Sequence, residues 1–151
     1  MFSVRSVVIS LNSLQNMIKN IIAQLRKWIP ALVMMGVIFW FSSQPSTDLP
    51  NFDWADKIVK KGGHMLGYAI LAWSYWYAFD MQSNQRWLAW LLAIFYAVTD
   101  EIHQSYVPGR TSSMWDVLIF DNLGALISLW VANKTLNKKR SDQPAPNRYY
   151  Y

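Results

Sequence analysis

The sequence predicts an all-α membrane protein, a four-transmembrane-helix bundle with an N-terminal amphipathic helix. Hydrophobic residues make up 53% of the 151 residues and charged residues only 15%, well below the roughly 25% that is usual for soluble domains. Long apolar runs recur along the chain, as expected of membrane spans. Nine Trp and eight Tyr residues add amphipathic rings, which favour membrane–water boundaries.

Residues 1–27 are predicted to form the amphipathic helix. Between residues 4 and 25, apolar side chains recur at spacings of one, three and four, while polar and basic side chains occupy much of the other side. Such a helix can lie on the inner leaflet of a membrane or pack against the bundle. A start codon placed too early is a further reading of this segment, and the pattern alone leaves the three open.

Residues 28–133 are predicted to be the membrane domain. The first span has no charge for 20 residues, enough to cross about 30 Å of hydrocarbon at about 1.5 Å per residue. The third span must include polar residues because the apolar run from Trp87 to Thr99 is only 13 residues long. The four predicted spans are Trp28–Thr47, Gly62–Phe79, Trp87–Tyr106 and Met114–Val131.

Both termini are predicted to lie in the cytoplasm. Ten of the 14 Lys and Arg residues lie before residue 28, after residue 133 or at Arg86 in the middle turn, and four lie in the other two loops. Cytoplasmic segments carry such an excess of positive charge. Residues 134–151 are expected to form a basic, disordered cytoplasmic tail. Because the basic residues flank apolar spans, we expect no nucleic-acid partner.

Ionisable groups inside the spans predict a site in the outer half of the membrane. An ionised side chain at the bilayer centre costs at least about 2.5 kcal/mol, so ionisable residues inside a span usually have a function. Measured from the cytoplasmic end of each helix, His64, Asp100 and Asp121 lie roughly 18 to 22 Å deep, and His103 and Asp116 lie roughly 24 to 26 Å deep. Three helices therefore bring polar groups to a similar level.

Helical spacing adds neighbours to this level. Asp100, His103 and Gln104 are three and four residues apart and share one face. Tyr68 shares a face with His64 in the second span. The predicted ligand-binding residues are Lys61, His64, Tyr68, Asp100, Glu101, His103, Gln104, Arg110, Asp116 and Asp121.

Several chemistries fit these residues. Arg110 with Lys61 is suited to a phosphate or carboxylate arriving from the outer face. His64, Asp100 and His103 are candidate catalytic residues, because an acid–imidazole pair can shuttle protons or act as general acid and base. No nucleophile is recognisable. Two histidines with acids could also hold a divalent metal, but their spacing matches no short zinc signature, so we assign no metal and no cofactor.

A purely structural role is the alternative. Intramembrane polar groups can lock a bundle through interhelical hydrogen bonds worth about 0.6 kcal/mol each, and we favour this role for Gln104, Asn122 and Ser128. Small residues after Asp121 are expected to let another helix approach closely. Glu101 is expected to look toward water at the end of its helix.

Two motifs resemble the VanZ-like family over about residues 28–133. Residues 100–110 read DEIHQSYVPGR and are followed by Asp116 and Asp121, and residues 61–68 read KGGHMLGY. The resemblance implies a bacterial multi-pass membrane protein of the cell envelope. The family's namesake is associated with resistance to the glycopeptide teicoplanin, without a defined reaction. Many relatives carry an acid just before the Tyr, where this chain has Gly67.

The sequence thus supports three hypotheses. The first is a cell-envelope protein that binds an anionic lipid headgroup or a lipid-linked wall precursor at the outer leaflet. The second is a membrane enzyme, a hydrolase or transferase that acts on such a headgroup. The third is a structural or partner-binding module in which the polar residues only stabilise the bundle.

Overall fold

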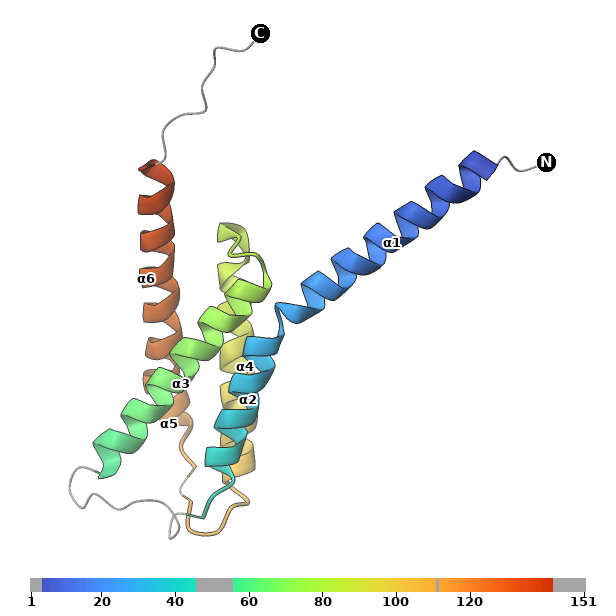
Figure 1. Cartoon of the computed structure of the whole chain (residues 1–151). Helices are drawn as coiled ribbons and strands as arrows, with labels where there is room; N and C mark the ends of the chain where they lie inside the picture. Colours follow the sequence, from blue (N-terminus) through green and yellow to red (C-terminus); the bar gives the residue numbers. More distant parts are fainter. Residues whose placement is uncertain (1–3, 46–55, 111, 143–151) are drawn as a thin grey trace.

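The computed structural model describes residues 4–45, 56–110 and 112–142, and all regular secondary structure in these residues is helical (Figure 1). Side chains are not described for residues 4–10, 56, 57, 59, 60 and 116. The elements in chain order are α1 Val4–Arg26, α2 Ile29–Ser42, α3 Asp56–Ala78, the 3₁₀ turn η3 Ser83–Gln85, α4 Arg86–Gln104, the short α5 Met114–Asp116, the π-turn η4 Val117–Asp121 and α6 Asn122–Ser141. The all-α prediction is confirmed.

Helix α3 is the centre of the bundle and packs against α2, α4 and α6 (Figure 1). Its buried side chains include Tyr68, Leu71 and Trp76. On α4, alanines recur at every fourth position and are fully or almost fully buried, at positions 89, 93 and 97. Because such small side chains line one face of a helix, a neighbouring helix can come close to its backbone.

Helices α3 and α6 approach each other closely at Gly124. A Cβ atom on this residue would lie 2.1 Å from the carbonyl oxygen of Met65, so only glycine fits there. Ala125 beside it is fully buried. The predicted stripe of small residues after Asp121 is therefore confirmed as a helix-packing surface.

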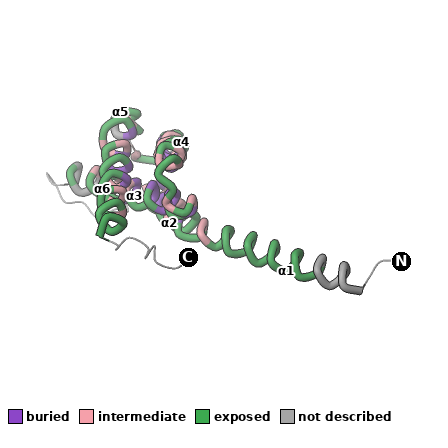
Figure 2. Tube along the Cα trace, turned by 90° about the horizontal axis from the view of Figure 1, so that it is seen from above, coloured by how far each residue is buried: buried purple, intermediate pink, exposed green. Residues whose placement is uncertain are grey.

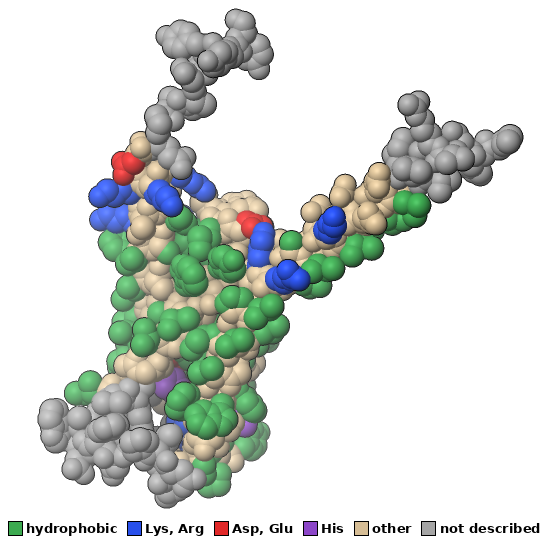
Figure 3. Space-filling view, viewed as in Figure 1, with side chains coloured by type: hydrophobic (Ala, Val, Ile, Leu, Met, Phe, Trp, Pro, Cys, Tyr) green, Lys and Arg blue, Asp and Glu red, His purple; other side chains and the backbone are tan. Residues whose placement is uncertain are grey.

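The outside of the bundle is apolar, and its two ends differ in charge. Large hydrophobic side chains are exposed on all four long bundle helices, including Trp40 on α2, Leu66 on α3, Phe95 on α4 and Trp130 on α6. Figure 3 shows hydrophobic side chains over the middle of the molecule, with Lys and Arg gathered at the end where α6 finishes and α1 meets α2. Two described stretches, Leu11–Ser42 and Val117–Ser141, are long and apolar enough to cross a membrane.

Three predicted boundaries shift. Helix α2 ends at Ser42 instead of residue 47, and α3 begins six residues earlier, at Asp56. Helix α6 runs to Ser141, eight residues into the predicted disordered tail. Residues 134–141 contain no Gly or Pro and are rich in Lys and Arg, which favour helix and suit a helix C-terminus. The rest of the predicted tail, residues 143–151, lies outside the described residues.

Candidate functional site

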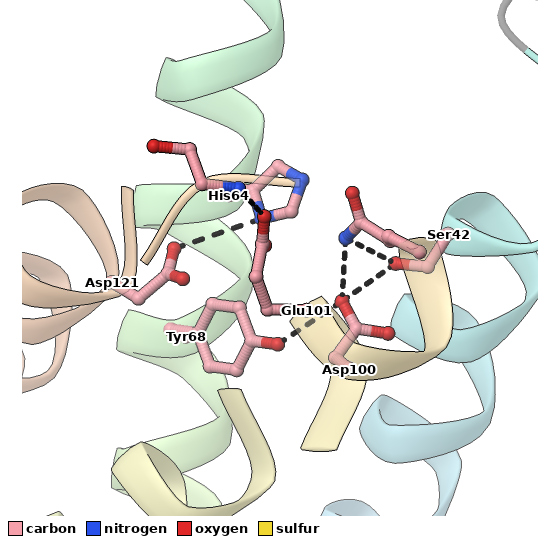
Figure 4. A network of polar contacts seen from close by, with 8 residues as sticks. Ser42, His64, Tyr68, Asp100, Glu101 and Asp121 are labelled. Atoms are coloured by element: carbon pink, nitrogen blue, oxygen red, sulfur yellow. Dashed lines mark hydrogen bonds and ion pairs between the residues drawn. The ribbon is translucent and has the colours of Figure 1, made fainter. Parts of the chain in front are cut away.

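Asp100 is the centre of a buried polar cluster (Figure 4). It lies near the carboxyl end of α4, away from the basic end of the bundle (Figures 1 and 3). Its oxygen Oδ2 accepts hydrogen bonds from Ser42 Oγ at 2.7 Å, Gln104 Nε2 at 2.9 Å and Tyr68 OH at 3.3 Å. Gln104 Nε2 also donates to Ser42 Oγ at 3.2 Å. Asp100 is only 3% exposed, so this one oxygen ties α2, α3 and α4 together away from water. Its other oxygen, Oδ1, is buried without a hydrogen-bond partner among the described residues.

His64 on α3 connects this cluster to η4, the turn that leads into α6. Its Nδ1 lies 3.6 Å from Oδ1 of Asp121, which is almost completely buried at the end of η4. The distance is longer than a hydrogen bond, so the attraction is mainly electrostatic. The His64 ring also stacks on Tyr68, with 6.2 Å between ring centroids. The carboxylates of Asp100 and Glu101 act electrostatically on the same imidazole.

Glu101 faces the protein interior, so the expectation that it looks toward water is wrong. It is 5% exposed and accepts a hydrogen bond from the backbone N–H of Ser113. The loop after α4 turns back and supplies this donor just before α5 begins. Helical periodicity could not reveal this contact, because the donor lies 12 residues along the chain in a non-helical segment.

His103 lies beside the cluster, against the end of α2. Its Nε2 is 3.0 Å from Ser43 Oγ, and its ring stacks on Phe39 with 4.6 Å between centroids. The Ser43 hydroxyl also donates to the Phe39 carbonyl at 2.7 Å. The structure therefore brings Asp100 and Gln104 together as predicted, whereas the described contacts of His103 are with α2.

Arg110 caps the carboxyl end of α2. Its Nε donates to the Gln44 carbonyl at 3.1 Å and its Nη2 donates to the Phe41 carbonyl. These carbonyls lie in the last turn of the helix and just beyond it, where acceptors have no partner within the helix. Burial lowers the pKa of Arg110, and Asp100 and Glu101 oppose that change. A guanidinium nevertheless stays charged in proteins.

The turn that delivers Arg110 depends on Gly109, whose φ of 73° is in the left-handed region that favours glycine. The other predicted cation, Lys61, places its ammonium 4.5 Å from the ring centroid of Phe120 on η4, as a cation–π contact. Both residues are partly exposed. Their joint action on one anion stays a prediction.

Asn122 and Ser128, for which a structural role was predicted, differ in whether their described hydrogen bonds join two helices. Asn122 Oδ1 accepts a hydrogen bond from Trp90 Nε1 at 2.8 Å, which joins α6 to α4 as a structural role requires. Ser128 instead donates to the Ala125 carbonyl within its own helix at 3.0 Å, so no described hydrogen bond of Ser128 joins two helices. The side chain of Asp116 lies outside the described residues.

Sequence reasoning missed Ser42 and Ser43. The depth argument could have found them, because Ser42 lies 14 residues beyond Trp28, or roughly 21 Å from the end of the first span that is predicted to be cytoplasmic. That is the depth predicted for Asp100. Both serines lie inside the predicted span Trp28–Thr47, but they were not included among the predicted site residues.

The assembled cluster is rich in carboxylates and hydroxyl groups, with one imidazole between two acids. Such a set can accept hydrogen bonds from hydroxyl or ammonium groups and can pass protons through His64. In the described part of the chain, no group of three His, Cys, Asp or Glu residues is placed to hold a metal ion.

A family model described as VanZ/LLP1 matches residues 27–136 of the chain, which include every side chain of this cluster. No curated protein and no solved structure showed significant similarity to the chain.

Proposed function

This chain belongs to the VanZ/LLP1 family, and from that premise we propose that it is a multi-pass protein of the bacterial cell envelope. In this proposal residues 28–133 are a membrane domain of four spans built on α2, α3, α4 and α6, and both termini lie in the cytoplasm. The support is the apolar outer surface of all four helices together with basic residues at one end. A water-soluble monomer rarely exposes so much contiguous apolar surface.

The same proposal gives the polar cluster an outer-leaflet ligand, an anionic lipid headgroup or a lipid-linked wall precursor. The observation that carries it is the convergence of Ser42, Tyr68, Asp100 and Asp121 from separate elements, with partly exposed Arg110 and Lys61 nearby in the fold. Helix packing by itself does not require buried acids and an imidazole, which are costly in an apolar bundle.

Charge decides how such a ligand would sit. Buried carboxylates repel an anion, so the phosphate or carboxylate group belongs at Arg110 and Lys61. The carboxylates of the cluster then accept hydrogen bonds from the ligand's hydroxyl or amine groups. Arg110 uses two of its five N–H donors on α2 carbonyls, which leaves donors for an anion.

Binding measurements on the purified protein test this assignment. With short-chain phosphatidylglycerol and a polyprenyl phosphate as probes, Arg110→Ala should weaken binding by roughly tenfold to a hundredfold, the usual loss for a charge-assisted contact. Arg110→Lys, which keeps the charge but not the planar fork, should fall between. Arg86→Ala is the matched control, because Arg86 lies in the middle turn, away from the cluster, and its described side-chain hydrogen bond is local, to the Ser83 carbonyl. Unchanged binding by a folded Arg110→Ala protein would reject the assignment.

A membrane hydrolase or transferase is the second candidate function. The observation that favours it is the 3.0 Å separation of Ser43 Oγ and His103 Nε2, both partly exposed, because a serine beside an imidazole can become a nucleophile. His64 is the other potential acid or base. The bond from Ser43 to the Phe39 carbonyl counts against it, since that hydroxyl proton already has an acceptor.

Labelling with a long-chain fluorophosphonate separates the two functions. The enzyme hypothesis requires that the wild-type protein is labelled, that Ser43→Ala removes the label, and that His103→Ala slows labelling while the helix content stays unchanged. Ser105→Ala, an exposed serine at the same end of α4, should label normally. Absence of any label would leave binding as the function of the site.

An envelope ligand also fits the family's link to teicoplanin. We extend the proposal to glycopeptide resistance: a protein that engages wall precursors or headgroups at the outer leaflet would alter how a glycopeptide reaches its target. Expression of the wild-type chain should then raise tolerance to teicoplanin, and Arg110→Ala should not.

A further inference from the structure

Helix α1 leaves the bundle as an arm, which we call the α1 arm and define as residues 11–26, where side chains are described. Every residue of the arm is exposed. Figures 1 and 2 show it projecting away from the other helices. It leaves from the end of the bundle where Lys and Arg gather (Figure 3). The reading in which this helix packs along the bundle is therefore wrong.

The α1 arm carries an apolar stripe. Six large side chains on one side of the helix are 44% to 64% exposed, namely Leu11, Leu14, Ile18, Ile21, Ile22 and Leu25. The other side carries amides and the basic residues Lys19 and Arg26, and residues 4–26 contain no Asp or Glu. A strongly amphipathic helix with only positive charge is typical of segments that lie in a membrane interface.

The root of the arm is fixed to the bundle. Lys27 forms an ion pair with Asp80, and Gln24 Nε2 donates to the Ala78 carbonyl at 2.9 Å. Both partners lie at the carboxyl end of α3 and in the turn after it, at the basic end of the molecule. These contacts set the place where the arm departs, at the level where the apolar surface of α2 begins with exposed Ile29.

We propose that the α1 arm docks on the cytoplasmic leaflet of the membrane that holds the bundle, with its apolar stripe among the acyl chains and its basic residues on anionic headgroups. This inference rests on the membrane topology of the proposed function, but it does not need the outer-leaflet site. Lys19 and Arg26 favour an anionic surface, to which juxtamembrane basic residues are attracted.

Two other placements fit less well. The whole stretch Leu11–Ser42 has 32 residues, or about 48 Å of helix, which is too long for a hydrocarbon core of about 30 Å. The amides and Lys19 on one side of the arm also need water or headgroups. A second copy of the chain would offer another arm of the same positive charge, which repels the first.

Site-directed spin labelling of the full chain tests the proposal, because the chain contains no cysteine and single cysteines can be placed freely. Ile18→Cys reports the apolar stripe and Asn16→Cys reports the polar side. In vesicles of phosphatidylcholine with 30% phosphatidylglycerol, oxygen should relax the Ile18 label more strongly, and a water-soluble nickel complex should relax the Asn16 label more strongly.

Charge removal tests the anionic partner. Lys19→Gln with Arg26→Gln should shift the Ile18 label toward the nickel complex and lower the membrane-docked fraction relative to the free fraction on the order of tenfold. Vesicles of pure phosphatidylcholine should produce the same shift with the unaltered arm. The proposal is overturned if the nickel complex alone relaxes both labels, which would place the arm in water, or if oxygen alone relaxes both, which would place it across the membrane. Dipolar coupling between Ile18 labels of two chains would also overturn it, because the arm would then pack on a second copy.

Discussion

At the scale of single residues, one carboxylate oxygen organises the site. Asp100 Oδ2 receives donors from α2, α3 and α4, so the side chains of Ser42, Tyr68 and Gln104 depend on one acceptor in an apolar bundle. Buried donors without an acceptor are costly, because water is not available to replace it. Asp100 is therefore a structural residue as well as a predicted ligand-binding residue, and substitutions there need two measurements.

Asp100→Ala should lower the free energy of unfolding by about 1 to 3 kcal/mol, because the buried hydroxyls of Ser42 and Tyr68 lose the acceptor described here and Gln104 keeps only its bond to Ser42. Asp100→Asn should cost less, since its carbonyl oxygen can still accept these bonds. Thermal unfolding in detergent, followed by circular dichroism, measures both, with the exposed neighbour Thr99→Ala as control. Equal losses for Ala and Asn would mean that Oδ2 is not the acceptor that matters.

The same variants separate a ligand site from a structural module. If the cluster only stabilises the bundle, lipid binding should follow stability, so that Asp100→Asn binds almost as well as wild type. If the carboxylate itself contacts the ligand, Asp100→Asn should lose binding while its thermal stability changes little.

At the scale of elements, α3 depends on close contact with its neighbours. The backbone of α3 at Met65 touches α6 at Gly124, and the described surface of α4 toward the core is lined by alanines. In the proposed membrane setting there is no hydrophobic driving force between helices, so van der Waals contact of this kind would contribute much of their association. Because α3 carries His64 and Tyr68, its distance from α6 also sets the separation of His64 from Asp121.

Gly124→Ala should destabilise the bundle by about 1 to 3 kcal/mol or more, since the new methyl group would collide with backbone that cannot move aside cheaply. Gly62→Ala is the matched control on α3. A Cβ there meets nothing within 4 Å, so the change should be neutral or stabilise the helix by up to about 1 kcal/mol. The two variants can be compared by thermal unfolding in the same detergent; similar melting temperatures would contradict the packing described here.

At the scale of the whole molecule, charge and polarity are divided between the two ends. Lys and Arg gather where α1 meets α2 and where α6 finishes (Figure 3). The buried acids Asp100 and Glu101 lie near the carboxyl end of α4, toward the opposite end of the bundle (Figure 1). If this axis is the membrane normal, the positive-inside rule places the basic end in the cytoplasm and the polar cluster toward the outer face.

Labelling of intact cells with a membrane-impermeant maleimide checks this orientation. Ser112→Cys, exposed in the loop before α5, should react from outside. Ser83→Cys and Ser141→Cys, exposed at the basic end, should react only after the membrane is permeabilised. The reverse pattern would invert the topology and place the cluster in the inner half of the membrane.

Much of this protein follows from local sequence. The apolar runs predict helices, and the spacings that pair Asp100 with Gln104 and His64 with Tyr68 hold in the structure, because the period of a helix is a local property. The small stripe at Gly124 could be predicted for the same reason. The resemblance to the family could also be identified without a structure, because its motifs at residues 61–68 and 100–110 are defined by the order of residues along the chain.

Only the tertiary structure decided which distant groups meet. Glu101 is buried because a loop returns to give it a donor, Arg110 reaches the carbonyls at the end of α2, and Ser43 lies against His103. Helical periodicity predicts which side chains share a face, but it does not predict which helix packs against that face or where a loop turns back. The direction of the α1 arm was open for the same reason, since an amphipathic pattern requires an apolar partner without saying whether that partner is protein or lipid.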